Sequence, residues 1–194
     1  MAQQSTFLEE LMAAGRGVAG LLIGDKRAGS YFDFSRRGLY GSFIALLIAR
    51  GLISIVPTLL GASAKADPSI ARSIAVDVIL FGMEVAFSAI VLRQLKRMDG
   101  LVPYLVADNW TTFFLTIVAA AIAAAGIGGD LVTIVLGIIV IVLQVNIARI
   151  VVTLAPLQIA MFLVAQVVGA VLGLMIVNVI FPLPPEVMDQ LIGS

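Results

Sequence analysis

Residues 38–61 read GLYGSFIALLIARGLISIVPTLLG, and this apolar run decides the fold class. It is long enough to cross a bilayer, because a transmembrane helix needs about 20 predominantly apolar residues. One charged residue, Arg50, lies near its middle. Residues 73–92, SIAVDVILFGMEVAFSAIVL, form a second such run that contains Asp77 and Glu84. The two stretches predict neighbouring transmembrane helices.

The composition of the whole chain supports the same class. Of its 194 residues, 61% are hydrophobic and 12% are charged, whereas soluble domains carry about 45–50% apolar and about 25% charged residues. We therefore expect an all-α integral membrane protein with the lipid bilayer as its surroundings. The formal net charge is +0, so no overall field attracts nucleic acid, and we expect no nucleic-acid partner.

The residue types that are missing exclude several kinds of chemistry. The chain contains no cysteine and no histidine, which removes thiol nucleophiles, disulfides, Cys or His zinc sites and His-ligated haem. The acidic residues are too scattered to indicate an all-oxygen metal site. No phosphate loop, nucleotide-binding fingerprint or nucleophile elbow is present. We expect neither a cofactor nor a metal, and no enzymatic activity.

The apolar runs predict a bundle of five transmembrane helices within residues 38–181. Residues 1–37 are then a cytoplasmic amphipathic segment, and residues 182–194 an extracytoplasmic tail. An odd number of spans argues against the inverted repeats of many transporters. The predicted spans are 39–61, 72–93, 110–127, 131–153 and 157–181.

The first 37 residues contain a short predicted helix. Thr6 followed by Glu9 is the signature of a capping box, so we expect the helix to begin at Phe7. In residues 7–23, apolar residues are interrupted by Glu9, Glu10 and Arg16, and the stretch is too short and glycine-rich to span. It predicts an interfacial helix lying on the membrane, and a helix packed on the cytoplasmic face of the protein is an equally good interpretation.

Orientation follows from the distribution of basic residues, which concentrate on the cytoplasmic side of membrane proteins. With the N-terminus in the cytoplasm, only Lys65 and Arg72 lie outside, and the C-terminus is extracytoplasmic. The short loops favour a bacterial inner membrane. The cytoplasmic basic residues are then Arg16, Lys26, Arg27, Arg36, Arg37, Arg93, Lys96, Arg97 and Arg149.

The charges inside the first two spans are the strongest candidate site. A lone charge at the bilayer centre costs about 2.5–3.5 kcal/mol on insertion scales. Arg50 and Glu84 fall at matching depth on adjacent spans, which predicts that they pair. Asp77 lies seven residues before Glu84 on the same helix face and nearer the outer boundary. Three roles stay open: a structural ion pair, a proton or substrate path, and contact with another subunit.

Two further groups of residues predict helix ends and helix packing. Asp108, Asn109 and Trp110 precede the third span, where Asp108 or Asn109 can cap the helix and Trp110 can anchor it at the interface. Small residues let helices approach closely in lipid. The alanine-rich third span is therefore expected at the bundle centre, and the GxxxG pair of the fifth against a helix of this chain or of a second copy. These packing residues include Ala121, Ala125, Gly169 and Gly173.

Neutral polar side chains occur in the last two predicted spans: Gln144, Asn146, Gln166 and Asn178. They can form hydrogen bonds between helices or line a narrow path.

Five closely spaced spans follow the polar stretch at 21–37, and Asp108-Asn109-Trp110 heads the third. This layout resembles Yip1-domain membrane proteins and their bacterial relatives, over most of the chain. The resemblance implies a membrane-organising or partner-binding protein without a catalytic centre. We therefore expect an accessory or scaffold subunit that acts through helix–helix contacts, as a homo-oligomer or with other membrane-protein subunits. The alternative is a small transporter or channel subunit with an Arg50/Glu84 polar path, which a hydrated cavity reaching Glu84 would favour.

Overall fold

The computed structural model describes residues 6–59 and 69–182, with side chains for 6–52 and 74–182, and the described parts are helical without strands. Short 3-10 turns (Ala28–Tyr31 and Met98–Gly100) and a π-helical turn (Ile147–Val151) connect the helices. The helices are α1 (Phe7–Ile23), α2 (Arg36–Leu59), α3 (Ser69–Gln94), α4 (Leu101–Ala124), α5 (Asp130–Asn146) and α6 (Pro156–Ile180).

Four stretches of the described chain are long and apolar enough to cross a membrane, which indicates a membrane-inserted protein. They are Ile74–Gln94, Met98–Ala124, Asp130–Val151 and Pro156–Ile180. α2 has 24 residues but is not among the four, since its described side chains end at Leu52. The count of five spans thus stays a prediction. The end of the first predicted span and the C-terminal tail lie outside the described residues.

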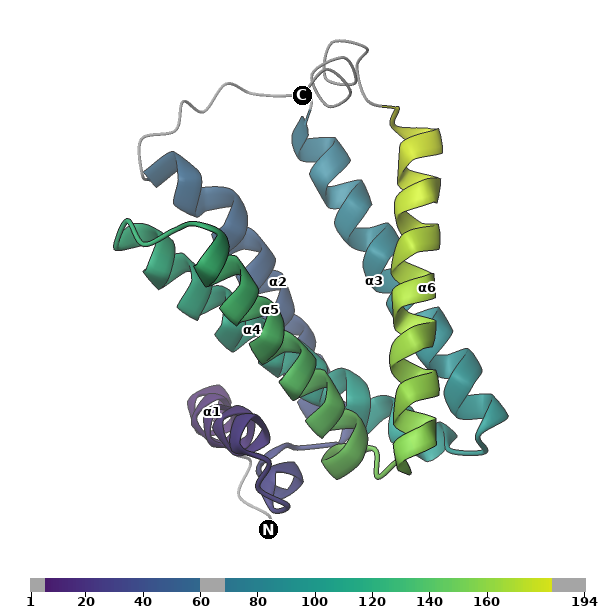
Figure 1. The fold of residues 1–194 in the computed structure, drawn as a ribbon. Helices are drawn as coiled ribbons and strands as arrows, with labels where there is room; N and C mark the ends of the chain where they lie inside the picture. Colours follow the sequence, from purple (N-terminus) through teal and green to yellow (C-terminus); the bar gives the residue numbers. More distant parts are fainter. Residues whose placement is uncertain (1–5, 60–68, 183–194) are drawn as a thin grey trace.

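The long helices form two groups that converge at one end of the molecule (Figure 1). We call α2, α4 and α5 the three-helix group, and α3 with α6 the helix pair. α2 packs along α4, and α3 packs along α6. The chain alternates between the groups, because α3 and α6 each follow a helix of the three-helix group. Side chains that cross from one group to the other therefore hold the two together.

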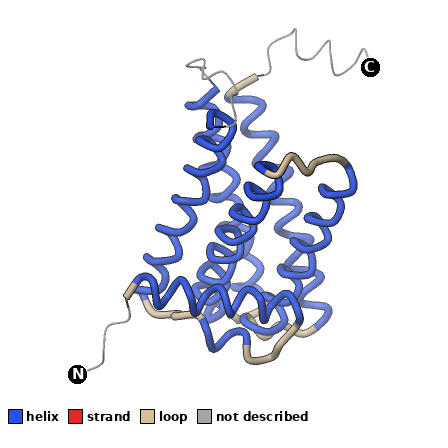
Figure 2. Tube along the Cα trace, turned by 90° about the vertical axis from the view of Figure 1, so that its left-hand side faces the viewer, coloured by secondary structure: helices blue, strands red, loops and turns tan. Residues whose placement is uncertain are grey.

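α1 lies across the converging ends of the other helices (Figure 2). The predicted capping box is confirmed: the Thr6 amide donates to Glu9 Oε2 at 2.7 Å, and the Glu9 amide donates to Thr6 Oγ1 at 3.3 Å. At its other end, the Asn146 amide group donates to the Leu21 carbonyl at 2.7 Å. One face of α1 is thus packed on the protein. The opposite face leaves large apolar side chains exposed, including Leu8, Met12 and Ile23.

The predicted small-residue contact of the last helix is confirmed and lies within this chain. Gly169 and Gly173 are buried on α6, and a Cβ atom at these positions would lie 3.0 Å from Phe87 and 2.9 Å from Leu80 of α3. The prediction for the third span is partly wrong. α4 is enclosed over its first half, whereas Ala121 and Ala125 are exposed at its far end, because the two helix groups diverge there (Figure 1).

α4 begins at Leu101, well before the predicted start at residue 110. The stretch before Trp110 reads as a loop because it contains Pro103, Asp108 and Asn109. Pro103 is tolerated in the first turn, where the backbone amides have no helical acceptor in any case. The predicted cap at Asp108 or Asn109 is therefore wrong, since both residues lie in the interior of the helix.

Candidate functional site

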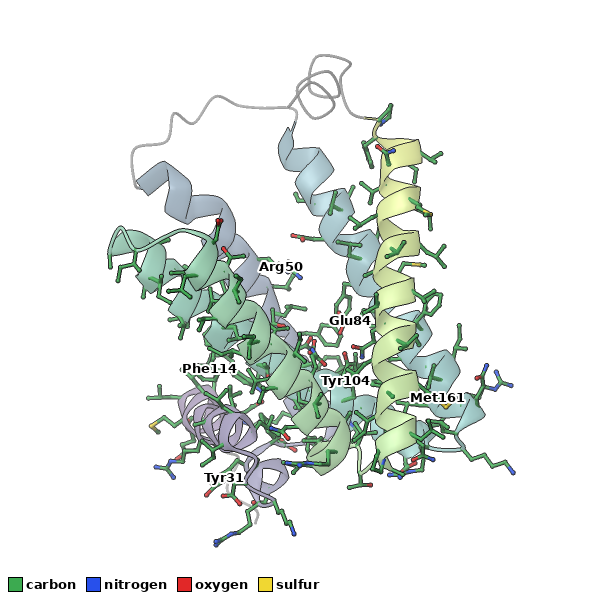
Figure 3. The ribbon with its side chains drawn as sticks, in the orientation of Figure 1. Tyr31, Arg50, Glu84, Tyr104, Phe114 and Met161 are labelled. Atoms are coloured by element: carbon green, nitrogen blue, oxygen red, sulfur yellow. The ribbon has the colours of Figure 1, made fainter. Side chains whose placement is uncertain are left out.

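An ion pair connects the two helix groups. Arg50 Nη1 on α2 donates to Asp77 Oδ1 on α3 at 3.0 Å. Each side chain keeps 41% of its surface exposed, so the pair is not sealed inside the bundle. Figure 3 shows Arg50 and Glu84 pointing into the space between the groups. The ion pair found here joins Arg50 to Asp77, the other acidic residue of the predicted site, and the pairing of Arg50 with Glu84 stays a prediction.

Glu84 instead belongs to a chain of hydrogen bonds around Tyr104. The Tyr104 hydroxyl donates to Glu84 Oε1 at 2.7 Å and accepts from Gln166 Nε2 at 2.7 Å. Gln166 Nε2 also lies 3.4 Å from Ser88 Oγ. Tyr104 is fully buried, and its ring meets Phe162 edge-to-face with centroids 5.0 Å apart. α3, α4 and α6 are therefore joined at a single tyrosine.

Asp108 extends this network to α5. It accepts a hydrogen bond from Gln144 Nε2, and it lies one helical turn after Tyr104, which donates to Glu84. Two acidic side chains, Glu84 of α3 and Asp108 of α4, thus belong to the same region of the bundle. We call these two residues the carboxyl pair. We call Arg50, Asp77, Glu84, Ser88, Tyr104, Asp108, Gln144 and Gln166 the polar cluster.

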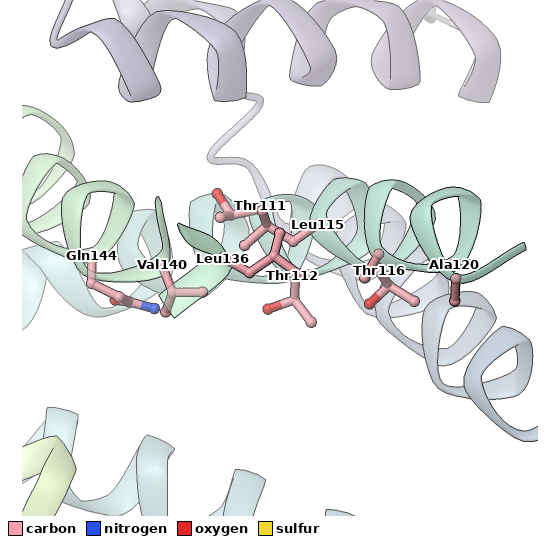
Figure 4. Close-up of a pocket in the computed structure, with 10 residues that line it drawn as sticks. Thr111, Thr112, Leu115, Thr116, Ala120, Leu136, Val140 and Gln144 are labelled. Atoms are coloured by element: carbon pink, nitrogen blue, oxygen red, sulfur yellow. The ribbon is translucent and has the colours of Figure 1, made fainter. Parts of the chain in front are cut away.

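A cavity of about 470 Å³ adjoins the polar cluster between α4 and α5. Its walls are mostly apolar, with Leu115, Leu136 and Val140 beside several alanines. Gln144 lies in its lining and donates to Asp108, so the cavity reaches the carboxyl pair through one side chain. In Figure 4 the side chains of Thr112 and Thr116 extend from α4 toward the space facing the helix pair.

Several buried acceptors near this cavity have no hydrogen-bond partner. They include Gln144 Oε1 and Thr111 Oγ1, both on residues that line the cavity, and Asn109 Oδ1. Thr111 is only 3% exposed. A buried polar group without a partner costs about 1–3 kcal/mol, so acceptors lining a cavity favour a ligand that brings hydrogen-bond donors.

The residues of the predicted third-span motif have other roles. Asn109 is fully buried and donates from Nδ2 to Ser42 Oγ of α2 at 3.0 Å. Trp110 is 1% exposed and stacks against Phe114 and Phe7 with centroids 6.2 and 6.0 Å apart. It therefore packs under α1 and is not an anchor at the membrane surface.

Sequence reasoning found Arg50, Asp77 and Glu84 and expected glutamines to bond between helices, as Gln144 and Gln166 do. It missed Tyr104, Ser88 and the role of Asp108. The available signal was spacing: Tyr104 and Asp108 are four residues apart, which places them on one face once the stretch is a helix. Asn146 bonds to α1, and Asn178 is exposed.

Comparison of the chain with protein-family models, curated proteins and solved structures gives no match. The resemblance to Yip1-domain proteins therefore stays a prediction. Among the described residues, no group of three or more Asp or Glu side chains is arranged to hold a metal ion.

Proposed function

We propose that this chain is a membrane transport protein whose pathway runs between the three-helix group and the helix pair. The main support is the ion pair of Arg50 and Asp77, which is half-exposed. It lies at the open end of the polar cluster, and a cavity adjoins the same cluster. Ionisable groups inside a membrane protein often mark an ion or substrate path. The cluster also includes the carboxyl pair of Glu84 and Asp108.

The competing role, a scaffold held by helix–helix contacts, requires a different centre. A purely structural ion pair inside a protein repays its desolvation only when further hydrogen bonds satisfy its remaining polar atoms. Here the pair keeps much of its surface exposed, and Gln144 Oε1 has no partner. These two features support a path for water or solute over a dry packing device.

The proposal includes a topology. The N-terminus is cytoplasmic, α2 crosses the membrane in addition to the other four spans, and the protein resides in a bacterial inner membrane. Support comes from the converging end, where α1 and the connections after α3 and α5 gather (Figure 1). Basic residues of these segments, such as Arg16, Arg97 and Arg149, lie at this end, which fits the cytoplasmic side. The exposed apolar face of α1 then rests on the lipid surface.

Cysteine accessibility tests the pathway directly, because the chain has no native cysteine. We expect Thr112→Cys and Thr116→Cys, in the cavity lining, to react with a membrane-impermeant maleimide in intact cells. Ile138→Cys is the control, because it is exposed on the opposite face of α5, which would face lipid. Protection of both cavity positions from reagent added on either side of the membrane would contradict the proposed pathway and favour the scaffold.

A further inference from the structure

The polar cluster carries an excess of negative groups. In the described parts of the long helices, away from their ends, Arg50 is the basic side chain, whereas Asp77, Glu84 and Asp108 are acidic. Arg50 pairs with Asp77. Glu84 and Asp108 accept hydrogen bonds from Tyr104 and Gln144, which are uncharged, so three acidic side chains lie beside one basic side chain. An additional positive charge is therefore favourable here, and an anion is not.

The cavity beside this charge is apolar and of ligand size. Small-molecule sites are typically about 300–1,000 Å³, mostly apolar and oriented by a few polar groups, and this one has about 470 Å³. Leu115, Leu136 and Val140 supply an apolar wall. The ligand body that fits is thus hydrocarbon or aromatic.

The unpartnered acceptors specify the polar end of the ligand. Gln144 Nε2 is engaged with Asp108, which leaves Oε1 of the same amide as a buried acceptor. Thr111 Oγ1 also has no partner, but it points toward α1 and away from Gln144 (Figure 4). An ammonium group has several N–H donors and no acceptor, so it complements the amide oxygen of Gln144 and the carboxyl group of Asp108.

We propose that the cavity between α4 and α5 binds a lipophilic amine in its protonated form, with its ammonium group toward Gln144 and Asp108. This inference rests on the proposed function and names its substrate class. The ammonium group supplies positive charge that a proton on Glu84 or Asp108 would otherwise supply, so binding of the amine competes with protonation of the carboxyl pair. The groups that face the carboxyl pair are Arg50, Asp77, Ser88, Tyr104, Gln144 and Gln166.

Binding to the purified full-length chain in lipid nanodiscs tests the inference. Phenethylamine is the probe, and phenethyl alcohol is the neutral analogue of nearly equal shape. We expect saturable amine binding that is at least about tenfold tighter than alcohol binding, a difference of about 1.4 kcal/mol. If one proton is displaced, amine affinity rises by up to about tenfold per pH unit, and calorimetry in buffers of different ionisation enthalpy detects the released proton.

Variants separate the site from general effects. Asp108→Asn should weaken amine binding at least about tenfold and abolish proton release. Because this buried change can impair folding, Gln144→Leu provides a milder test with the same expected direction. Asp130→Asn, at the exposed start of α5, is the control and should bind like the parent.

Two outcomes overturn the inference: equal binding of amine and alcohol, or no amine binding by folded protein. If the amine fails while Thr112→Cys and Thr116→Cys still react with maleimide, the ligand class is wrong and the pathway stands. If the cysteines are also protected, the proposed function fails as well.

Discussion

The Arg50 guanidinium and the Asp77 carboxylate meet at 3.0 Å between α2 and α3. Arg50 lies nine residues before the end of α2, and Asp77 lies eight residues after the start of α3. Glu84 lies two turns further along α3, where it accepts a hydrogen bond from Tyr104. The pair thus bridges the helix groups on their open side, and the tyrosine bridges them further in.

Breaking the ion pair should destabilise the protein, and reversing it should not. We expect Arg50→Gln or Asp77→Asn to lower the free energy of unfolding by about 1–3 kcal/mol, between the values for exposed and buried pairs. The double variant Arg50→Asp with Asp77→Arg should recover much of this loss. Thermal unfolding in detergent micelles measures each effect.

The control for this swap is Arg50→Glu with Glu84→Arg. It should not recover stability, because arginine at position 84 cannot accept the hydrogen bond from Tyr104. Equal recovery by both swaps would show that the two carboxylates are interchangeable partners of the guanidinium.

Arg97 joins the two connections at the converging end of the bundle. Its Nη2 donates to the Val152 carbonyl at 2.6 Å and to Thr153 Oγ1 at 2.7 Å, and its Nη1 donates to the Thr153 carbonyl at 3.1 Å. Lys96 and Thr153, one in each connection, have positive φ angles of 56° and 58°. Non-glycine residues rarely adopt this conformation, so the arginine helps to hold two strained turns together.

We expect Arg97→Lys to destabilise the protein by about 1.5–3 kcal/mol, the range for hydrogen bonds that involve a charged group. A lysine ammonium is a point donor and cannot reproduce the planar fork of the guanidinium. Arg93→Lys, at the exposed end of α3, is the matched control and should leave the unfolding midpoint unchanged. A loss of the same size in both variants would contradict a specific role for Arg97.

The class of the protein could be predicted from the sequence because hydrophobic length alone determines it. The π-helical turn and the pairing of α3 with α6 could not, since both depend on packing between distant segments. Gly169 and Gly173 indicated a close helix contact, but small residues carry no information about which helix approaches.

The polar cluster was only partly predictable for a related reason. Arg50, Asp77 and Glu84 stand out because a charge in an apolar run is costly. Tyr104 and Asp108 lie in a stretch that reads as a loop, because it contains residues typical of turns. Only tertiary burial extends α4 back to Leu101, and this extension brings both side chains into the cluster.

Packing of α6 on α3 offers a test that needs no ligand. Gly173→Leu should destabilise the fold by about 1–3 kcal/mol, as overpacking of a filled interior does, because a Cβ atom there already lies 2.9 Å from Leu80. Gly137→Leu on α5 is the control, since a Cβ atom there meets nothing within 4 Å. The two variants should differ clearly in unfolding midpoint. Similar midpoints would mean that the contact of α6 with α3 contributes little.

Docking of α1 should depend on pH through Glu10. This side chain is 8% exposed, its Oε1 has no partner, and it lies against Gly41 of α2. Burial raises the pKa of Glu10 above its ordinary value, the Asp33 carboxylate raises it further, and the Arg37 guanidinium opposes both. The folded state therefore favours the protonated carboxyl. Its contribution to stability is complete below the unfolded pKa of about 4.3 and is lost as the pH rises through the folded pKa.

The only tryptophan of the chain reports on this docking, because the Trp110 ring lies 6.0 Å from the Phe7 ring of α1. We expect its emission to shift to longer wavelength as the pH rises from about 4, because α1 loosens and water reaches the indole. Glu10→Gln keeps a neutral side chain at every pH and should abolish the shift, whereas Asp130→Asn should retain it. A shift that persists in Glu10→Gln would assign the pH dependence to another group.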